Sequence, residues 1–191
     1  MRFDGTTTPA AIRVVRHPAR FSGAILQWLQ ENVPEGSYLD PMAGVGGVHV
    51  LAGELEHADG RITRRITVGV EIEPEWAAMH RETRYGDLFE VLPRWAAENV
   101  LFNGIVVSCC YGNRFADHHN AADNSERHGY THDLRETTGD MKRKLAATSS
   151  GTLHFGRAYI DWHRRAWDVC ATVLVPRGWM FLNVSDFIRR K

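Results

Sequence analysis

The chain has 191 residues, of which 43% are hydrophobic and 24% are charged, an ordinary composition for one globular domain with a single core. This composition excludes a disordered or fibrous protein. The 23 basic and 23 acidic side chains balance, so no overall field draws the chain to a polyanion. Any contact with nucleic acid must therefore come from a local patch.

Three cysteines, Cys109, Cys110 and Cys170, are an odd number and include no Cys-x-x-Cys pair. Such a set does not form the disulfide framework of a small secreted domain. The first residues have no apolar region typical of a signal peptide, and no run of 18 apolar residues occurs anywhere. We therefore expect a cytoplasmic protein that does not span a membrane.

The first predicted element is an amphipathic helix over 21–32, where apolar side chains recur at helical spacing and Ser22 can serve as the N-cap. A short strand at 37–39 then runs into a glycine-rich turn over 40–47. From this turn to about residue 58 the sequence predicts a second helix, which its glycines weaken.

A second strand is predicted over 66–71, where apolar residues alternate with polar ones. Pro74 suits the first position of a helix over 75–82. A short third strand and turn follow at 84–87, and a helix is expected over 88–98.

A buried fourth strand is predicted over 103–108, a helix over 157–174 and a fifth strand over 179–184. Alternating strands and helices predict an α/β fold, a mostly parallel sheet with helices on both faces, which binds ligands beyond the carboxyl ends of its strands. We expect a single domain over 1–191. The polar segment 112–156 has no clear apolar period and is interpreted as a long insertion.

An acidic residue closes each of the first three predicted strands: Asp40, Glu71 and Asp87. Gly44 and Gly46, after the first strand, allow backbone to come close to a bound ligand. Glu71 can accept the hydroxyls of a ribose and Asp87 an adenine amine. The other interpretations are an ordinary tight turn, a solvated carboxylate and a helix N-cap.

Five segments together resemble the S-adenosylmethionine-dependent amino-methyltransferases that act on DNA. The segment 40–46 is similar to their D-P-F-x-G-x-G motif, and 69–76 resembles their second motif. The segment 108–111 stands in place of the catalytic (D/N/S)-P-P-(Y/F/W) loop. The segment 16–22 resembles the motif beside the methionine end of the cofactor, and 175–179 the turn before the fifth strand.

The resemblance covers roughly 16–188 and is specific in combination. The run 111–119 looks most like methyltransferases carried by actinobacterial phages, which would place the protein in the cytoplasm of the host cell. It implies a Rossmann-like class I methyltransferase fold and phage DNA modification.

The resemblance further implies S-adenosylmethionine as cofactor. Gly44 and Gly46 would lie under the methionine moiety, Glu71 would hold the ribose, Ile72 would pack on the adenine and Asp87 would take its amine. The complete set of implied cofactor-binding residues is His17, Phe21, Asp40, Pro41, Ala43, Gly44, Gly46, Glu71, Ile72, Asp87 and Ser108.

The implied catalytic loop consists of Ser108, Cys109, Cys110 and Tyr111. Ser108 Oγ and the Cys109 carbonyl would accept the hydrogens of the target amine, and Tyr111 would stack on a base that has left the duplex. The loop departs from the family because two cysteines replace the two prolines that fix its backbone. Either packing holds the loop and the enzyme works, or catalysis has been lost.

DNA, the implied substrate, would be contacted from the insertion. The candidate contacts are Asn113, Arg114, His118, His119, Lys142, Arg143 and Lys144. A solvated surface is the other interpretation of 141–144. The adjacent cysteines and the later histidines offer zinc ligands, but their spacing matches no recognised finger or ribbon, so no metal site is expected.

The leading hypothesis is methyl transfer to cytosine N4 or adenine N6 in DNA. Its rival is a catalytically degenerate methyltransferase fold that serves as a binding or interaction module, and NAD-dependent oxidoreduction ranks last. The family's sheet normally has seven strands, whereas this chain reaches Lys191 soon after the fifth. We therefore expect the last two strands to be missing. Either a second copy or another protein closes the sheet, or the protein is a shortened enzyme.

Overall fold

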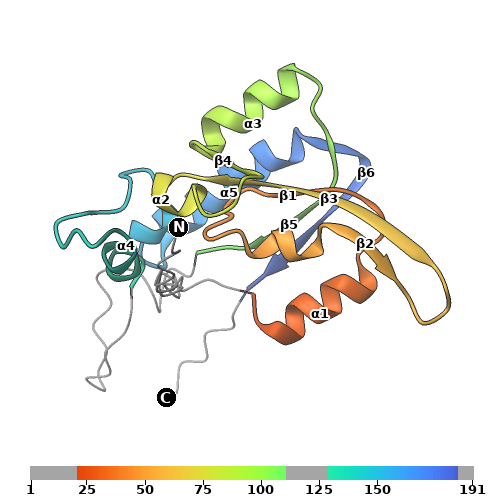
Figure 1. The fold of residues 1–191 in the computed structure, drawn as a ribbon. Coiled ribbons are helices and arrows are strands. Elements are labelled where there is room, and N and C mark those ends of the chain that lie inside the picture. The colour runs from red at the N-terminus through yellow and green to blue at the C-terminus, as the bar shows by residue number, and fades with distance from the viewer. Residues whose placement is uncertain (1–20, 111–128, 185–191) are drawn as a thin grey trace, which may run out of the picture.

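The computed structural model describes residues 21–110 and 129–184 (Figure 1). In chain order its elements are α1 (Gly23–Asn32), β1 (Gly36–Asp40), the 3-10 helix η1 (Gly47–Leu51), β2 (Gly53–Glu56), β3 (Ile62–Glu71), α2 (Pro74–Ala77), β4 (Thr83–Tyr85), α3 (Leu88–Ala97), β5 (Phe102–Ser108), α4 (Tyr130–Thr138), the 3-10 helix η2 (Ser150–Thr152), α5 (Arg157–Ala171) and β6 (Leu174–Asn183).

The strands form one mixed sheet in the order β2-β3-β1-β5-β6, and β4 also pairs with β3. Strand β2 is antiparallel to the first part of β3, at 62–65, whereas β4 is parallel to its last part, at 69–71. The pairs of β1 with β3, β1 with β5 and β5 with β6 are parallel. The expected α/β class is confirmed. Starting from β1, the chain first adds β3 on one side and later β5 on the other, which is consistent with a Rossmann-like fold.

Helices cover both faces of the sheet (Figure 1). On one face Tyr38 and Val106 pack with α1 and η1, and on the other Leu39 and Ile105 pack with α3 and α5. The side chains of each strand point alternately to the two faces, so neighbouring residues enter different cores. Burial on both faces explains why the middle of β5 is an unbroken apolar run.

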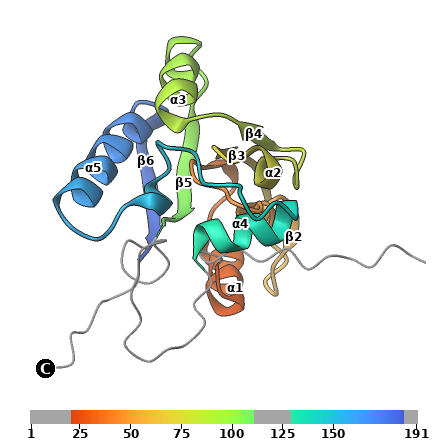
Figure 2. The ribbon, with the colours of Figure 1, turned by 90° about the vertical axis from the view of Figure 1, so that its left-hand side faces the viewer.

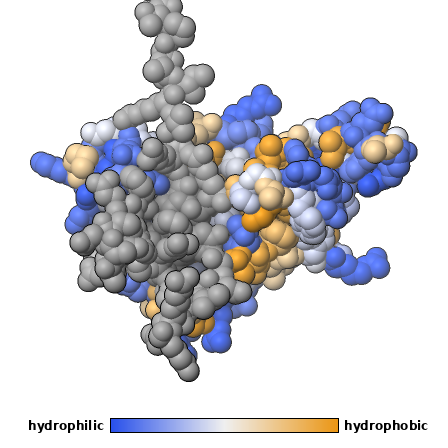
Figure 3. Space-filling model, turned by 90° about the horizontal axis from the view of Figure 1, so that it is seen from below, coloured by the Kyte–Doolittle hydropathy of each residue, from blue (hydrophilic) through white to orange (hydrophobic). Residues whose placement is uncertain are grey.

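Helix α1 begins as predicted, because the Ser22 hydroxyl accepts the N–H of Ile25 at 3.3 Å. Its outer side remains partly apolar, since Trp28 is 50% exposed and stacks on Phe181 of β6 with ring centroids 5.5 Å apart. Figure 3, seen from below, shows hydrophobic surface in the middle of this side of the molecule.

Two predicted helices are wrong in extent. Instead of a helix to about residue 58, the chain makes one turn of η1 and then β2, which pairs with β3 from Gly53 to Glu56. The glycine positions and this tertiary pairing outweigh the local helical pattern. Helix α2 covers only Pro74–Ala77, because the chain turns at His80 to return as β4.

The insertion at 112–156 is not a continuous loop in its described part. It contains α4 and η2. The sequence of α4 has low hydropathy, and the buried apolar residues of this helix are Tyr130 and Leu134. These two side chains pack with Trp76 and Leu145 in a small cluster of their own. Figure 2 shows α4 and the segment after it in front of the strand ends.

No helix within 21–110 and 129–184 combines the length and the apolar character that crossing a lipid bilayer requires.

Candidate functional site

A pocket lies at the carboxyl ends of β1, β3, β4 and β5, where an open parallel sheet is expected to bind its ligand. About 40 Å³ of it is open to the centre of a water-sized sphere. Its walls come from the strand ends, the start of α3, α5 and the insertion. The lining residues are Pro41, Met42, Glu71, Ile72, Trp76, Gly86, Asp87, Leu88, Cys110, Tyr130, Thr148, Ser149, Ser150 and Trp162.

Five of the residues implied by the resemblance meet in this pocket: Pro41, Glu71, Ile72, Asp87 and Cys110. They come from four segments that are separated in the sequence by up to 69 positions, from residue 41 to residue 110. Parallel pairing puts all four strand ends at one edge, which is what brings these segments together.

Glu71 ties the turn after β1 to the end of β3. One oxygen accepts the N–H of Gly44 at 2.7 Å and the other the N–H of Glu73 at 2.8 Å. Burial raises the pKa of Glu71 to about 7, although these two backbone donors favour its charged form. The carboxyl is therefore poised between its charged and neutral forms near neutral pH.

Asp87 serves as the N-cap of α3, because its Oδ1 accepts the N–H of Phe89 at 2.9 Å. Its other oxygen accepts the hydroxyl of Thr148 at 2.9 Å. The capping interpretation is thus correct, and the side chain also lines the pocket.

Asp40 lies beneath the turn rather than on the wall of the pocket. It is 2% exposed, and its Oδ1 accepts the N–H of Met42 at 3.0 Å. Burial raises its pKa to about 8, against the effect of the Met42 N–H, and the nearby Glu71 raises it further. Asp40 is therefore mostly protonated at neutral pH and shapes the turn rather than offering a charge to a ligand.

The remaining residues of the turn fix its backbone. Gly44 and Gly46 have φ of 52° and 84°, a conformation that favours glycine. The N–H of Ala43 donates to the carbonyl of Val70 at 2.9 Å, which seats the turn on the sheet. Phe21 is buried in the α1 core, under Gly47.

The catalytic loop of the resemblance is described only as far as Cys110. Ser108 Oγ accepts the side-chain amide of Asn183 at 3.0 Å, and the Cys110 carbonyl accepts the hydroxyl of Tyr159 at 2.6 Å. The Cys109 thiol donates to the Asn183 carbonyl at 3.8 Å. Burial raises the pKa of Cys109 and, to about 12, that of Cys110, so both thiols remain protonated.

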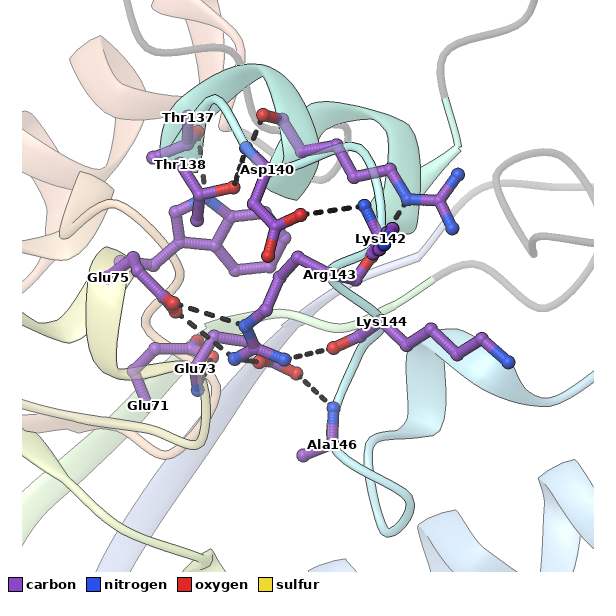
Figure 4. Close-up of polar contacts among 12 residues, drawn as sticks. Glu71, Glu73, Glu75, Thr137, Thr138, Asp140, Lys142, Arg143, Lys144 and Ala146 are labelled. Atoms are coloured by element: carbon purple, nitrogen blue, oxygen red, sulfur yellow. Dashed lines mark hydrogen bonds and ion pairs between the residues drawn. The ribbon is translucent and has the colours of Figure 1, made fainter.

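Six of the predicted site residues lie outside the described residues: His17, Tyr111, Asn113, Arg114, His118 and His119. Of the basic cluster, Lys142 and Lys144 are exposed. Arg143 was expected to reach a phosphate, but it pairs with Glu73 at 2.7 Å and Glu75 at 3.1 Å. This correction arises because the insertion folds back onto α2 (Figure 4).

Several residues that complete the pocket could not be predicted from the sequence. Tyr130, Thr148, Ser149 and Ser150 come from the insertion, which was interpreted as a loop. Trp162 packs against the core, and its Nε1–H donates to the Thr148 carbonyl at 3.1 Å at the pocket wall. The helical spacing of Tyr130 and Leu134 is the one signal that could have indicated α4.

Within the described residues, side chains that could hold a metal ion gather at His132, Asp133 and Glu136 on α4, with ligand atoms within 4.8 Å of one another. The cysteines do not belong to this group. All three members lie on one helix, where His132 pairs with the buried Asp133 and, one turn away, with the exposed Glu136.

No protein-family model matches this sequence, and no curated protein matches it.

Proposed function

We propose that the protein binds S-adenosylmethionine in the pocket at the strand ends and transfers its methyl group to an exocyclic amino group of a DNA base, cytosine N4 or adenine N6. The observation that carries the proposal is the meeting of Pro41, Glu71, Ile72, Asp87 and Cys110 around one pocket. Pro41, Glu71, Ile72 and Cys110 belong to three segments of the resemblance, and Asp87 is the residue that it implies for the adenine amine.

The pocket offers a nucleoside suitable partners. Each oxygen of Glu71 accepts one backbone N–H, which leaves a lone pair on each for a ribose hydroxyl. Ile72 and Leu88 supply apolar surface for a purine ring. Asp87 Oδ2, which accepts the Thr148 hydroxyl in this structure, would accept the exocyclic amine in its place.

The bound cofactor would supply an electrophilic methyl group, so the residues of the chain have to orient and desolvate rather than to form a covalent bond. An exocyclic base nitrogen is a poor nucleophile because its lone pair is delocalised into the ring. Ser108 Oγ and the Cys109 carbonyl would accept its hydrogens and align the nitrogen with the methyl group.

A second candidate function is a degenerate methyltransferase fold that binds a nucleoside ligand without catalysis. The observation that favours it is the state of the loop after β5, where Asn183 already donates to Ser108 Oγ and Tyr159 to the Cys110 carbonyl. A target amine would have to replace the first of these donors. Cysteine in place of proline also leaves this backbone freer.

Calorimetric titration with S-adenosylmethionine, followed by labelled-methyl transfer to phage and host DNA, separates the two. Binding together with transfer supports the enzyme, and binding without transfer supports the degenerate module. Absence of both would refute the proposal. Glu71→Gln should weaken binding, whereas Glu54→Gln, at an exposed position of β2, serves as the matched control.

A further inference from the structure

Residues 139–152, which we call the strap, run from the end of α4 through η2 and pass along one side of the pocket. Thr148, Ser149 and Ser150 of the strap belong to the pocket wall. With the strap in place, about 40 Å³ of the pocket is open to the centre of a water-sized sphere. The strap therefore narrows the pocket beside Asp87.

The middle of the strap is fastened to the start of α2. Glu73 has no exposed surface, and its two oxygens accept the Ala146 N–H at 2.6 Å and Arg143 Nη2 at 2.7 Å. Glu75 receives the Nε–H of Arg143 at 3.1 Å (Figure 4). We call these contacts of Arg143 and Ala146 with Glu73 and Glu75 the clasp. The clasp joins the strap to the loop that directly follows Glu71, so a movement of the strap also displaces backbone beside the pocket.

The last part of the strap is held by the pocket's own polar group. Thr148 donates its hydroxyl to Asp87 Oδ2, and its carbonyl accepts the indole N–H of Trp162. The other oxygen of Asp87 is engaged by the Phe89 N–H. A hydroxyl of the chain therefore occupies the carboxylate oxygen of Asp87 that the helix cap does not use.

We propose that the strap closes the pocket of the ligand-free protein and that Thr148 takes the place of a ligand's N–H donor on Asp87. The ligand that displaces it is a nucleoside with an exocyclic amine, such as the adenosine part of S-adenosylmethionine. The ligand class rests on the proposed function, whereas the closure of the pocket by the strap does not.

The rate at which the Cys110 thiol reacts measures closure of the pocket by the strap and needs no ligand. Cys110 lies on the pocket wall, and its thiol contacts the side chains of Ser150 and Tyr130. Cys109 and Cys170 are 3% and 0% exposed, so they serve as internal references. Arg143→Gln should remove the charged contacts with Glu73 and Glu75, while the Ala146 N–H still donates to Glu73. We expect the rate of Cys110 alkylation by a maleimide to rise about threefold to tenfold.

Arg64→Gln is the matched control, because Arg64 pairs with Glu54 at 2.6 Å on the hairpin of β2 and β3, away from the pocket. Peptide mass spectrometry assigns the label to each cysteine. Equal rates of Cys110 alkylation in the two variants would refute closure by the strap. If Arg143→Gln does not fold, Thr148→Val carries the same test against Thr148→Ser.

Calorimetry with S-adenosylhomocysteine tests the competition. Thr148→Val should bind about threefold to tenfold more tightly than wild type, and Thr148→Ser should bind as wild type does. Unchanged or weaker binding by Thr148→Val would overturn the competition at Asp87. If no variant binds the ligand, the ligand class and the proposed function both fail, while the alkylation rates still decide whether the strap closes the pocket.

Discussion

The guanidinium of Arg143 lies 2.7 Å from a carboxylate oxygen of Glu73, although 70 positions separate the two residues in the chain. Glu73 has no exposed surface, whereas the Arg143 side chain is 26% exposed. A buried carboxylate is tolerated when its hydrogen bonds are complete, and here the Ala146 N–H completes them. This contact makes the insertion part of the folded domain.

Replacing Glu73 by alanine should lower the free energy of unfolding by about 2–3 kcal/mol, because the Ala146 N–H and the guanidinium both lose their acceptor. Glu73→Gln keeps an acceptor for the Ala146 N–H and should cost less. Urea unfolding of the two variants measures the difference. Equal losses would contradict this, because they would mean that the acceptor and the volume kept by glutamine contribute nothing and that the charge alone accounts for the loss.

Asp87→Asn should separate the two roles of this residue. The amide oxygen of asparagine can still accept the Phe89 N–H and cap α3, but its NH₂ group donates where the carboxylate accepts. We expect an unchanged melting temperature and S-adenosylmethionine binding weakened by about 1–3 kcal/mol. Calorimetry beside thermal unfolding gives both quantities, and wild-type affinity would leave Asp87 with only its cap.

Asp40 should make the protein less stable as the pH rises. Its pKa of about 8 in the folded chain lies above that of an unfolded aspartate, so between about pH 4 and 8 the folded state holds the additional proton. Stability attributable to this group is full below about pH 4 and falls as the pH rises through 8. In Asp40→Asn this decline should disappear.

Unfolding of Asp40→Asn and wild type at pH 5, 6.5 and 8 checks the sign. The free energy of unfolding of Asp40→Asn, relative to that of wild type, should rise steadily from pH 5 to pH 8. Glu71, with a pKa raised to about 7, acts in the same direction in both proteins. A constant difference across the three pH values would contradict the protonated state of Asp40.

His49, in contrast to Asp40, should make the protein less stable as the pH falls. Its ring nitrogens contact Thr67 Oγ1 at 2.9 Å and Thr83 Oγ1 at 2.8 Å, and its ring stacks on His80 with centroids 3.7 Å apart. Burial, assisted by His80, lowers its pKa to about 4. Stability from neutral His49 is therefore present above about pH 6.5 and is lost as the pH falls toward 4.

Replacing His49 by glutamine should flatten the loss of stability between pH 6.5 and 4, although the variant starts from a lower stability because both threonine contacts change. His154→Gln, at an exposed position, is the control and should follow the wild-type curve. Melting temperatures over this range suffice. A wild-type acid slope in His49→Gln would exclude this histidine as its source.

Gly69 leaves room for the turn that follows β1. A Cβ at this position would lie 2.7 Å from Ala43 Cβ, 2.8 Å from Thr83 Oγ1 and 3.2 Å from His49 Nε2. Gly69→Ala should therefore destabilise the fold by about 1–3 kcal/mol. Gly23→Ala, where a Cβ meets nothing within 4 Å, should be neutral or stabilising. Denaturant unfolding distinguishes the two.

Local signals predicted the elements that depend on local chemistry. The Ser22 cap, the alternation along β3 and the apolar run of β5 each have a physical cause within a few residues, and the structure has these elements. Strand β2 was missed because it is stabilised by pairing with Arg64 and its neighbours on β3, which a single window of sequence does not contain.

The same limit applies to the site. The acids at the strand ends could be placed from the order of strands, since parallel pairing gathers their carboxyl ends. The partner of Glu73 could not, because Arg143 looks like any other residue of a basic surface cluster until the insertion is folded. The role of Thr148 could not be predicted either, because its contact with Asp87 depends on the path of the strap.

Strand β6 lies at one end of the strand order in the described part of the chain, and its first half is a poor template for another strand. Pro176 has no N–H to donate, and Arg177 adopts a left-handed φ of 67°, which breaks the regular ladder. Such features guard an exposed edge against aggregation. A strand that added itself to this sheet would therefore have to pair along 179–183, which leaves it a ladder of about 17 Å.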